Sequence, residues 1–145
     1  LTDTDLADRK QYNVASEDTI DVFKALPYYF SGYDFDDLPI IVIEIGHWDV
    51  FGLSEVQDKL ESELERFEDV FYGCLERISN SSVVNIDGDE TKVDEFVLII
   101  DFDDFNLKMM STSASSRLML KFWKRFKKYD NAVAYGFYIN LNAIS

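Results

Sequence analysis

The sequence contains little cysteine, little proline and few basic residues, and it has no long hydrophobic run. Its only cysteine, Cys74, allows no intrachain disulfide and favours a reducing compartment such as the cytoplasm. No apolar run approaches the roughly 18 residues that a membrane-spanning helix requires. Acidic residues number 28 and basic residues 14, and the net charge of −14 argues against a nucleic-acid partner. We therefore expect a cytoplasmic protein that binds no nucleic acid.

Hydrophobic and aromatic residues are abundant by comparison. They make up 47% and 15% of the 145 residues, with 12 phenylalanines and 8 tyrosines. A chain of this length can bury one sizeable core, so the composition indicates a globular domain rather than disorder. The aromatic side chains would either fill that core or line a cavity for an apolar molecule.

The charges are unevenly distributed along the chain. From Lys108 onward the sequence has seven basic residues and one acidic residue, Asp130, whereas the preceding part is strongly acidic. A basic face attracts anionic lipid headgroups, at roughly 1 kcal/mol for each cation near the surface. Transient, peripheral contact with an anionic membrane is therefore one interpretation. The alternative is the solvated face of an ordinary amphipathic helix.

Three apolar segments predict β-strands. They are residues Ile40–Ile45, Val93–Phe102 and Tyr135–Leu141, which are rich in β-branched and aromatic side chains. A turn-rich entry segment at residues 28–34 precedes the first strand. We interpret residues 1–27 as an acidic lead-in segment, with a short helix that begins near Ser16 or Glu17.

Two amphipathic segments between the strands predict helices. The second helix would begin within the serine-rich residues 111–116, and the first at an N-cap Ser54, with Gln57 completing a capping box. The order of strand, helix, strand, helix, strand predicts an α/β fold with a mainly parallel sheet and flanking helices. Three strands make a small sheet, so we expect the domain to be truncated at its C-terminus. The apolar face of the first helix comprises Val56, Leu60, Leu64, Phe67, Phe71, Leu75 and Ile78.

The central apolar run, Phe96–Ile100, ends abruptly in the carboxylates of Asp101, Asp103 and Asp104. Ligands often bind where parallel strands end. Asp101-x-Asp103 resembles the nucleophile loop of haloacid-dehalogenase-type phosphatases, in which one Asp attacks phosphorus beside Mg²⁺. A Mg²⁺-dependent phosphotransferase is therefore one alternative. Phe105 stands where those enzymes usually carry Thr or Val, so a solvated strand end is favoured, and we expect no catalytic residue, metal or cofactor.

Other residues that could react or bind a metal ion do not belong to a recognisable motif. His47 is the only histidine, so no second histidine could share a metal ion with it. Cys74 lies beside the apolar face of the first predicted helix, where a buried thiol is expected. Asp87, Asp89 and Glu90 lack the twelve-residue calcium loop with its closing Glu. We interpret these positions as a loop histidine, a packed thiol and a solvated turn.

Three blocks of sequence, in order, resemble the CRAL-TRIO lipid-binding domain. The first is Tyr-Phe-Ser-Gly-Tyr-Asp at residues 29–34 with Pro-Ile at 39–40, followed by the G-x-x-D-x-x-G-L pattern at residues 46–53. The second is the strand at residues 96–101. The third is Tyr-Asp-Asn at residues 129–131 with Tyr-Ile-Asn at 138–140. The resemblance implies a partial domain of this family over residues 28–145.

This resemblance implies a lipid carrier rather than an enzyme. The family includes the α-tocopherol and cellular retinaldehyde transfer proteins, supernatant protein factor and phosphatidylinositol transfer proteins, in which a sheet forms the floor of a cavity for one lipid. Asn131 replaces the Glu that accompanies inositol-headgroup binding, so phosphatidylinositol specificity is not implied. A protein-interaction module that has lost lipid binding remains an alternative, and the oligomeric state is open. By the same match the lipid-lining residues would be Ile41, Ile43, Phe67, Phe71, Phe96, Leu98, Ile100 and Tyr138.

Overall fold

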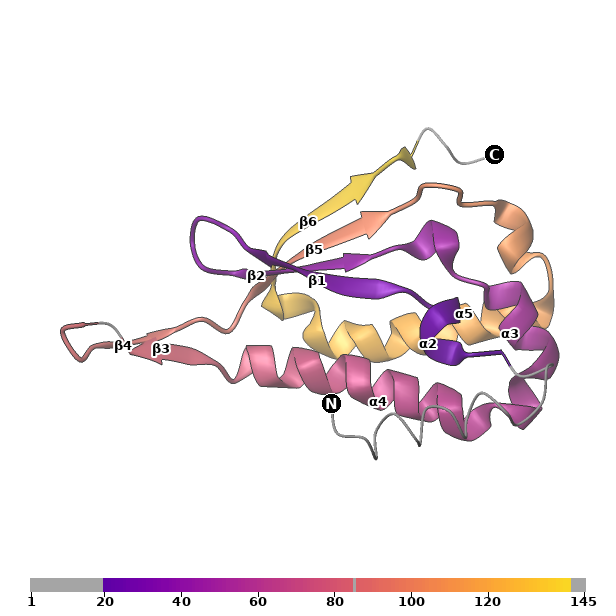
Figure 1. Cartoon of the computed structure of the whole chain (residues 1–145), viewed down its shortest axis with the longest axis horizontal. Coiled ribbons are helices and arrows are strands. Elements are labelled where there is room, and N and C mark those ends of the chain that lie inside the picture. Colours follow the sequence, from indigo (N-terminus) through magenta and orange to yellow (C-terminus); the bar gives the residue numbers. More distant parts are fainter. Residues whose placement is uncertain (1–19, 85, 142–145) are drawn as a thin grey trace, which may run out of the picture.

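The computed structural model describes residues 20–84 and 86–141, and it shows a four-stranded sheet with two long helices on one of its faces (Figure 1). The strand order is β1-β2-β5-β6. This arrangement confirms the predicted α/β fold with a mainly parallel sheet and flanking helices. In chain order the main elements are α2 (Val22–Ala25), β1 (Tyr28–Tyr33), β2 (Pro39–Ile43), α3 (Val50–Val56), α4 (Glu61–Ser79), β3 (Ser82–Val84), β4 (Glu90–Lys92), β5 (Phe96–Asp101), α5 (Ser113–Phe126) and β6 (Val133–Ile139).

The three predicted strands form the parallel part of the sheet. Ile41 of β2 pairs with Leu98 of β5, and Leu98 pairs with Gly136 of β6. β5 lies between two neighbours and most of its residues are buried, which explains its uninterrupted apolar sequence. Right-handed crossovers between successive parallel neighbours bring both connecting helices to the same face. Helices α4 and α5 lie together on that face (Figure 1).

Strand β1 occupies the segment that was predicted to be turn-rich, and that prediction was wrong. It pairs antiparallel with β2, from Tyr28 opposite Ile43 to Tyr33 opposite Pro39. The register shifts between Phe30 and Tyr33, where Gly32 has a φ of +107°. Glycine adopts this conformation without a steric penalty, so the strand continues through an irregularity that its sequence presents as a turn.

The first crossover begins earlier than predicted and consists of two helices. A carboxylate oxygen of Asp49 accepts the N–H of Gly52 at 3.0 Å and caps α3, and a 3-10 turn at Gln57–Lys59 separates α3 from α4. The prediction that Ser54 is an N-cap was therefore wrong. Ser54 lies inside α3, where its hydroxyl donates to the carbonyl of Phe51. Asp49, five residues before Ser54, supplies the capping side chain instead.

Helix α5 begins where the serine-rich segment predicted. Thr112 is its N-cap and forms a reciprocal capping box with Ser115. At the N-terminal side of the described chain, the side chains of Val22, Ala25 and Leu26 join the core. The boundary between lead-in segment and domain stays a prediction. The helix expected near Ser16 or Glu17 lies outside the described residues.

A short hairpin interrupts the polar segment between α4 and β5. Strands β3 and β4 pair antiparallel through three residue pairs, and Gly88 turns the chain with a φ of +83°. The hairpin projects from the same end of the molecule as the β1–β2 connection (Figure 1). The sequence indicated the turn at Asp87 and Gly88 but not the strands that flank it.

Aromatic rings dominate the core between the sheet and the helices. Phe67 and Phe71 of α4 and Phe122 of α5 lie within 6.5 Å of one another, measured between ring centroids. Trp48 is buried beside them, where its indole N–H donates to the carbonyl of Pro27 at 2.9 Å. Its ring also stacks on Trp123 at a centroid distance of 6.4 Å. Most aromatic residues near the centre therefore serve packing.

Candidate functional site

The structure places the predicted lipid-lining residues on the helix-covered side of the sheet. Tyr138 shares this side with its partner Ile100, but it lies on edge strand β6 and is 65% exposed. The alternation of β5 thus correctly predicted that Phe96, Leu98 and Ile100 share one face of the sheet. Aromatic rings of the protein itself pack against the centre of that face. The lipid-lining role stays a prediction. The other seven residues belong to one buried cluster: Ile41, Ile43, Phe67, Phe71, Phe96, Leu98 and Ile100.

Two of these residues, Ile41 and Phe71, also line a groove at the margin of the core. We call it the hairpin groove. It lies between the β1–β2 hairpin and the C-terminal half of α4, reaches the base of the β3–β4 hairpin, and has a volume of about 490 Å³. Its other lining residues are Tyr28, Tyr29, Phe30, Tyr33, Asp37, Pro39, Cys74, Leu75, Arg77, Ile78, Ser81, Ser82 and Val93.

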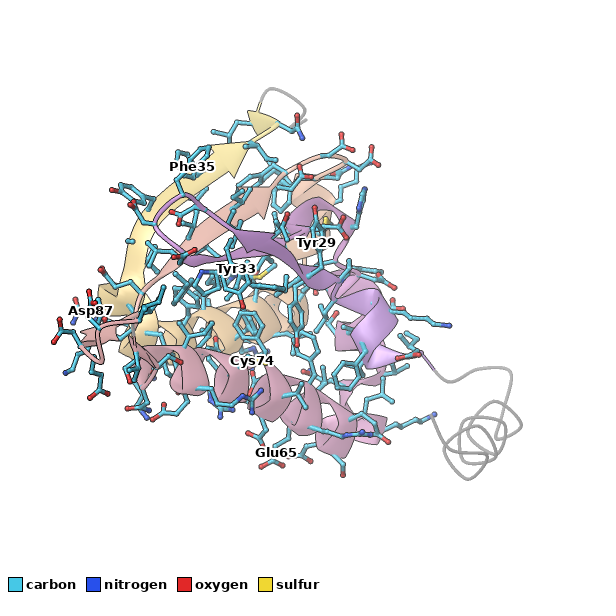
Figure 2. The ribbon with its side chains drawn as sticks, turned by 60° about the vertical axis from the view of Figure 1, so that its left-hand side comes forward. Tyr29, Tyr33, Phe35, Glu65, Cys74 and Asp87 are labelled. Atoms are coloured by element: carbon cyan, nitrogen blue, oxygen red, sulfur yellow. The ribbon has the colours of Figure 1, made fainter. Side chains whose placement is uncertain are left out.

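Aromatic side chains of β1 form one wall of the hairpin groove. The rings of Phe30 and Tyr33 meet edge to face at 5.2 Å, and Tyr28 meets Phe71 in the same manner at 4.9 Å. Figure 2 shows Tyr33 on the hairpin facing the helix that carries Cys74. Sequence reasoning missed Phe30 and Tyr33, because this segment was interpreted as a turn. Its dense aromatic sequence was the signal that could have revealed a groove wall.

The polar groups of the groove lie apart from its aromatic wall. Among the described lining residues, Arg77 is the single cation and Asp37 the single carboxylate. Arg77 also donates a hydrogen bond to the Sγ of Cys74 at 3.2 Å. Cys74 is half-buried in the wall, so its thiol is more exposed than the predicted buried thiol. The groove therefore combines an apolar interior with one charge of each sign.

A second hollow, near the N-terminal end of α4, is less suited to an apolar ligand. Its volume is about 240 Å³, and Phe67 and Phe122 contribute to its lining. Its remaining lining includes the ionisable residues Asp58, Glu61, Glu68, Arg117 and Lys121. The hairpin groove is larger and less charged, and it is the better candidate.

The carboxylate of Asp101 stabilises the ends of two strands. It accepts hydrogen bonds from the side-chain amide of Asn140, at 2.8 Å, and from the backbone N–H of Asp103, at 3.0 Å. These two bonds, that of Asn140 foremost, lower the pKa of Asp101 below its ordinary value. One carboxylate oxygen thus joins the end of β5 to the residues after β6. This is a structural role, and it agrees with the interpretation of a solvated strand end.

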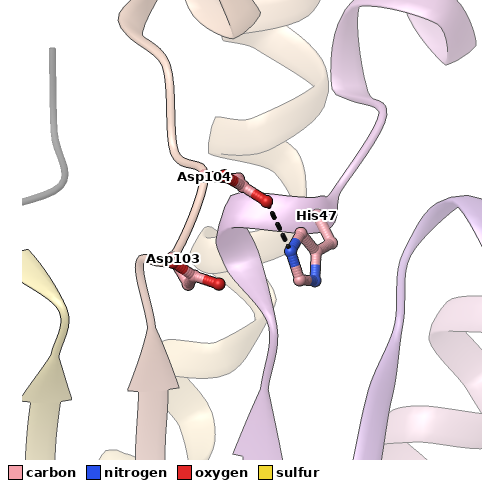
Figure 3. Close-up of side chains that lie close together, drawn as sticks. All are labelled: His47, Asp103 and Asp104. Atoms are coloured by element: carbon pink, nitrogen blue, oxygen red, sulfur yellow. Dashed lines mark hydrogen bonds and ion pairs between the residues drawn. The ribbon is translucent and has the colours of Figure 1, made fainter.

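Three ligand-type side chains meet at the same edge of the sheet (Figure 3). The Nε2 of His47 lies 3.2 Å from a carboxylate oxygen of Asp104, and potential ligand atoms of His47, Asp103 and Asp104 all lie within 4.8 Å of one another. Gly46 permits this arrangement, because a Cβ there would overlap the carbonyl oxygen of Asp103. All three side chains are exposed, and exposed acidic groups of this kind are common without a bound ion.

The basic face of α5 is partly neutralised by the acidic face of α4. Arg125 forms ion pairs with Asp69 at 3.0 Å and Glu68 at 3.7 Å, and Lys128, in the 3-10 helix that follows α5, lies 3.9 Å from Glu76. Burial raises the pKa of Glu68, although the neighbouring cations oppose this shift. Contact of α5 with an anionic membrane stays a prediction. Within residues 20–84 and 86–141, no helix combines the length and the apolar character needed to cross a bilayer.

Most of the chain is similar to a known domain family. Residues 23–141 match the model of the CRAL/TRIO domain, and this range includes all six strands and the helices α3, α4 and α5 in full, as well as α2 except its first residue. At 119 of 145 residues, the match covers most of the chain. The chain belongs to the CRAL/TRIO domain family. CRAL/TRIO domains are generally non-catalytic and bind small lipophilic ligands. No curated protein matches the chain significantly.

Proposed function

We propose that this CRAL/TRIO domain binds a lipophilic ligand in the hairpin groove and carries it between membranes. The observation that supports this most directly is an open groove of about 490 Å³ in which Ile41 and Phe71 meet the exposed aromatic wall of β1. Ligand sites commonly have volumes of roughly 300–1,000 Å³ and are mostly apolar with a few polar groups. The groove has this character.

Burial of apolar surface would supply the affinity. Phe30 and Tyr33 on the groove lining are 55% and 66% exposed. An acyl chain lying along them would cover these rings, and each of its own buried methylene groups would contribute about 0.8 kcal/mol. Binding by this means needs no covalent chemistry and no metal ion.

The two charges on the groove lining would orient the ligand. A lipid with an anionic and a cationic group in its headgroup could place them near Arg77 and Asp37, while its chain lies against the apolar wall. This proposal favours an amphipathic lipid over a pure hydrocarbon. It assigns no specificity for inositol.

The remaining predicted residues would form the deeper part of the same site. Ile43, Phe67 and Phe96 belong to the buried cluster that contains Ile41 and Phe71, as do Leu98 and Ile100. A long ligand would reach them if α4 moved away from the sheet. Tyr138, on the outer strand, would contact the ligand only if the site extended to β6.

Binding of the fluorescent fatty acid cis-parinaric acid tests this proposal. Tyr33→Ala removes half of the edge-to-face pair with Phe30, and we expect it to weaken binding about fivefold. Tyr135→Ala is the matched control, since Tyr135 is 56% exposed and lies on β6 outside the groove. It should leave the dissociation constant unchanged. Organic extraction of the purified chain followed by mass spectrometry should reveal a co-purifying lipid.

Two results would contradict the assignment. One is that the unmodified chain does not bind cis-parinaric acid and yields no extractable lipid. The other is that Tyr33→Ala and Tyr135→Ala weaken binding equally, because the probe would then respond to exposed aromatic surface in general.

A protein-interaction module is a second candidate function, and strand β6 favours it. Among the described strands β6 pairs only with β5, so its outer edge is open. Residues 133–139 contain no charged side chain, and Tyr135, Phe137 and Ile139 are exposed. Proteins usually protect such an edge with charge, proline or a covering element. If this edge binds another strand, Phe137→Lys should abolish the association in sedimentation experiments and preserve cis-parinaric acid binding.

A further inference from the structure

Two hairpin tips project from one end of the molecule (Figure 1), and each carries an apolar side chain that is fully exposed. Phe35 lies in the β1–β2 turn and Ile86 in the β3–β4 turn, and neither side chain has any surface protected by the described residues. In Figure 2 the Phe35 tip and the Asp87 tip again lie on the same side of the molecule. A single exposed apolar side chain is common on a protein surface, but two at the tips of paired hairpins at one end of the molecule can contact the same external surface.

Hydrogen bonds hold the first tip in place. One carboxylate oxygen of Asp34 accepts the N–H of Asp36 at 2.9 Å and that of Leu38 at 2.8 Å, and the N–H of Asp34 donates to the carbonyl of Leu38 at 3.0 Å. Asp37 completes the turn with a φ of +62°. The closed turn presents Phe35 outward without further ordering of the backbone, which would otherwise cost free energy on docking.

The second tip is held by its own strand pairing. Three residue pairs join β3 to β4, and the hydroxyl of Ser82 donates to the carboxylate of Glu90 at 2.5 Å. Gly88 supplies the positive φ that the turn requires. Ile86 is therefore presented on a paired hairpin, as Phe35 is.

The hairpin groove opens between these two structures. Tyr33 and Asp37 of the first hairpin line it, and so do Ser82 of β3 and Val93, which follows β4. A surface that contacts both tips would therefore face the groove. This geometry connects the tips to ligand entry and release.

The charges near the tips indicate which kind of lipid surface fits. Residues 33–37 read Tyr-Asp-Phe-Asp-Asp, and residues 86–90 read Ile-Asp-Gly-Asp-Glu, with no lysine or arginine in either segment. Anionic lipids would repel these carboxylates. The outward choline groups of zwitterionic phospholipid would not. Lys92 lies at the base of the second hairpin, and the larger group of basic residues that could attract anionic lipid lies on α5.

We propose that the Phe35 and Ile86 tips dock the domain on a zwitterionic phospholipid surface with the hairpin groove open toward it. This docking rests on the proposed lipid-carrier function and adds how the domain would contact a membrane. Two isolated apolar side chains on convex tips suit insertion between headgroups. A protein partner would instead need a continuous complementary surface of about 800 Å² on each side.

Flotation of the whole chain with phosphatidylcholine vesicles tests the docking. Phe35→Asp and Ile86→Asp should each lower the partition coefficient about tenfold, since each removes one inserting side chain. Leu107→Asp is the matched control, because Leu107 is 61% exposed and begins the 3-10 turn Leu107–Met110, drawn in orange at the opposite end in Figure 1. It should partition like the unmodified chain, and adding phosphatidylserine to the vesicles should weaken binding.

Hydrogen exchange of the unmodified chain provides a measurement without substitutions. Phosphatidylcholine vesicles should slow exchange at residues 33–37 and 86–90 more than at α5. Stronger protection of α5, a requirement for phosphatidylserine, or equal losses in the tip variants and Leu107→Asp would each overturn the proposal. Failure of the unmodified chain to float with phosphatidylcholine would overturn it as well.

Failure of the docking is distinguishable from failure of ligand binding. Phe35 and Ile86 do not line the groove, so their Asp variants should bind cis-parinaric acid in vesicle-free buffer with unchanged affinity. Loss of vesicle binding with retained cis-parinaric acid binding supports the docking role. Vesicle binding by a chain that does not bind cis-parinaric acid would contradict only the ligand proposal.

Discussion

Tyr72 shows how one side chain connects the two long helices. Its hydroxyl on α4 donates to the carbonyl of Phe122 on α5, and its ring stacks on Tyr129 at a centroid distance of 5.6 Å. The guanidinium of Arg125 lies 4.7 Å from the ring centroid. Burial is the largest cause that raises the pKa of Tyr72, because a buried phenolate would lose its hydration. The neutral, hydrogen-bonded phenol is therefore the form that joins α4 to α5.

We expect Tyr72→Phe to lower the free energy of unfolding by about 1 kcal/mol at neutral pH, since one buried hydrogen bond is lost while the ring packing remains. Urea denaturation followed by circular dichroism measures this change. Tyr138→Phe, at an exposed ring on β6, serves as the control and should have almost no effect. A Tyr72→Phe variant as stable as the unmodified chain would show that the hydroxyl does not stabilise the helix pair.

Alkaline pH should destabilise the chain through the same residue. Because the folded-state pKa of Tyr72 is raised, the unfolded chain loses this proton first as the pH rises through about 10. The contribution to stability is complete below that pH and is lost as the pH rises toward the folded-state pKa. Urea denaturation at several pH values should show a decline above about pH 10 that is shallower in Tyr72→Phe. Equal slopes would contradict the role of burial.

Gly46 lies where the segments that follow β2 and β5 approach each other closely. We expect Gly46→Ala to destabilise the chain by roughly 1–3 kcal/mol, because its methyl group would overlap the backbone of Asp103. The substitution should also separate His47 from Asp104. Thermal unfolding measures the first effect, and NMR of the His47 ring measures the second. Gly73→Ala is a suitable control, because a Cβ there meets nothing closer than the end of Arg77 at 4.0 Å.

At the scale of the element, α5 depends on its N-terminal cap. The backbone N–H of Ser115 donates to the hydroxyl of Thr112 at 3.1 Å, and the hydroxyl of Ser115 accepts the N–H of Thr112 at 3.2 Å. Thr112→Ala should therefore cost about 1 kcal/mol of stability, as measured by urea denaturation. Thr112→Asp retains a capping acceptor and should recover most of the loss. Equal losses in the two variants would mean that the cap is not what Thr112 contributes.

The sequence correctly predicted those elements whose local sequence pattern matches their burial and capping in the fold. The run Phe96–Ile100 of β5 is apolar because β5 is an inner strand of the sheet and most of these side chains are buried, and α5 begins at a capping residue inside the predicted segment. β1 could not be predicted in this way, because Gly32 and Ser31 indicate a turn and only pairing with β2 makes the segment a strand. The cap of the first crossover was misplaced because Asp49 and Ser54 both fit the cap pattern.

The candidate site was less predictable than the fold. Alternation identifies which side of β5 is shared by Phe96, Leu98 and Ile100, but it contains no information about whether facing helices leave a space there. The hairpin groove depends on how far β1 lies from α4. That distance follows from the packing of Tyr28 between Phe67 and Phe71, which no local sequence pattern expresses.

At the scale of the whole molecule, stability should decrease from the sheet centre toward the projecting hairpins. β5 is buried and paired on both edges, whereas β3 and β4 form a separate two-stranded sheet with exposed residues. Amide hydrogen exchange should therefore be slowest in β5 and β2, intermediate in β6, and fastest in β3 and β4. Comparable protection of β3–β4 and β5 would show that the hairpin unfolds only together with the core.

The stacked indoles of Trp48 and Trp123 are an intrinsic spectroscopic probe of the fold. The two ring planes differ by 17°, and one tryptophan precedes α3 while the other lies on α5. Two indole chromophores held this close should exchange excitation energy and produce a paired-band signal in the circular dichroism spectrum. Separation of the two segments would extinguish that signal even if every helix remained intact. Loosening of the interior by a guest molecule could thus be followed spectroscopically, without attaching a dye.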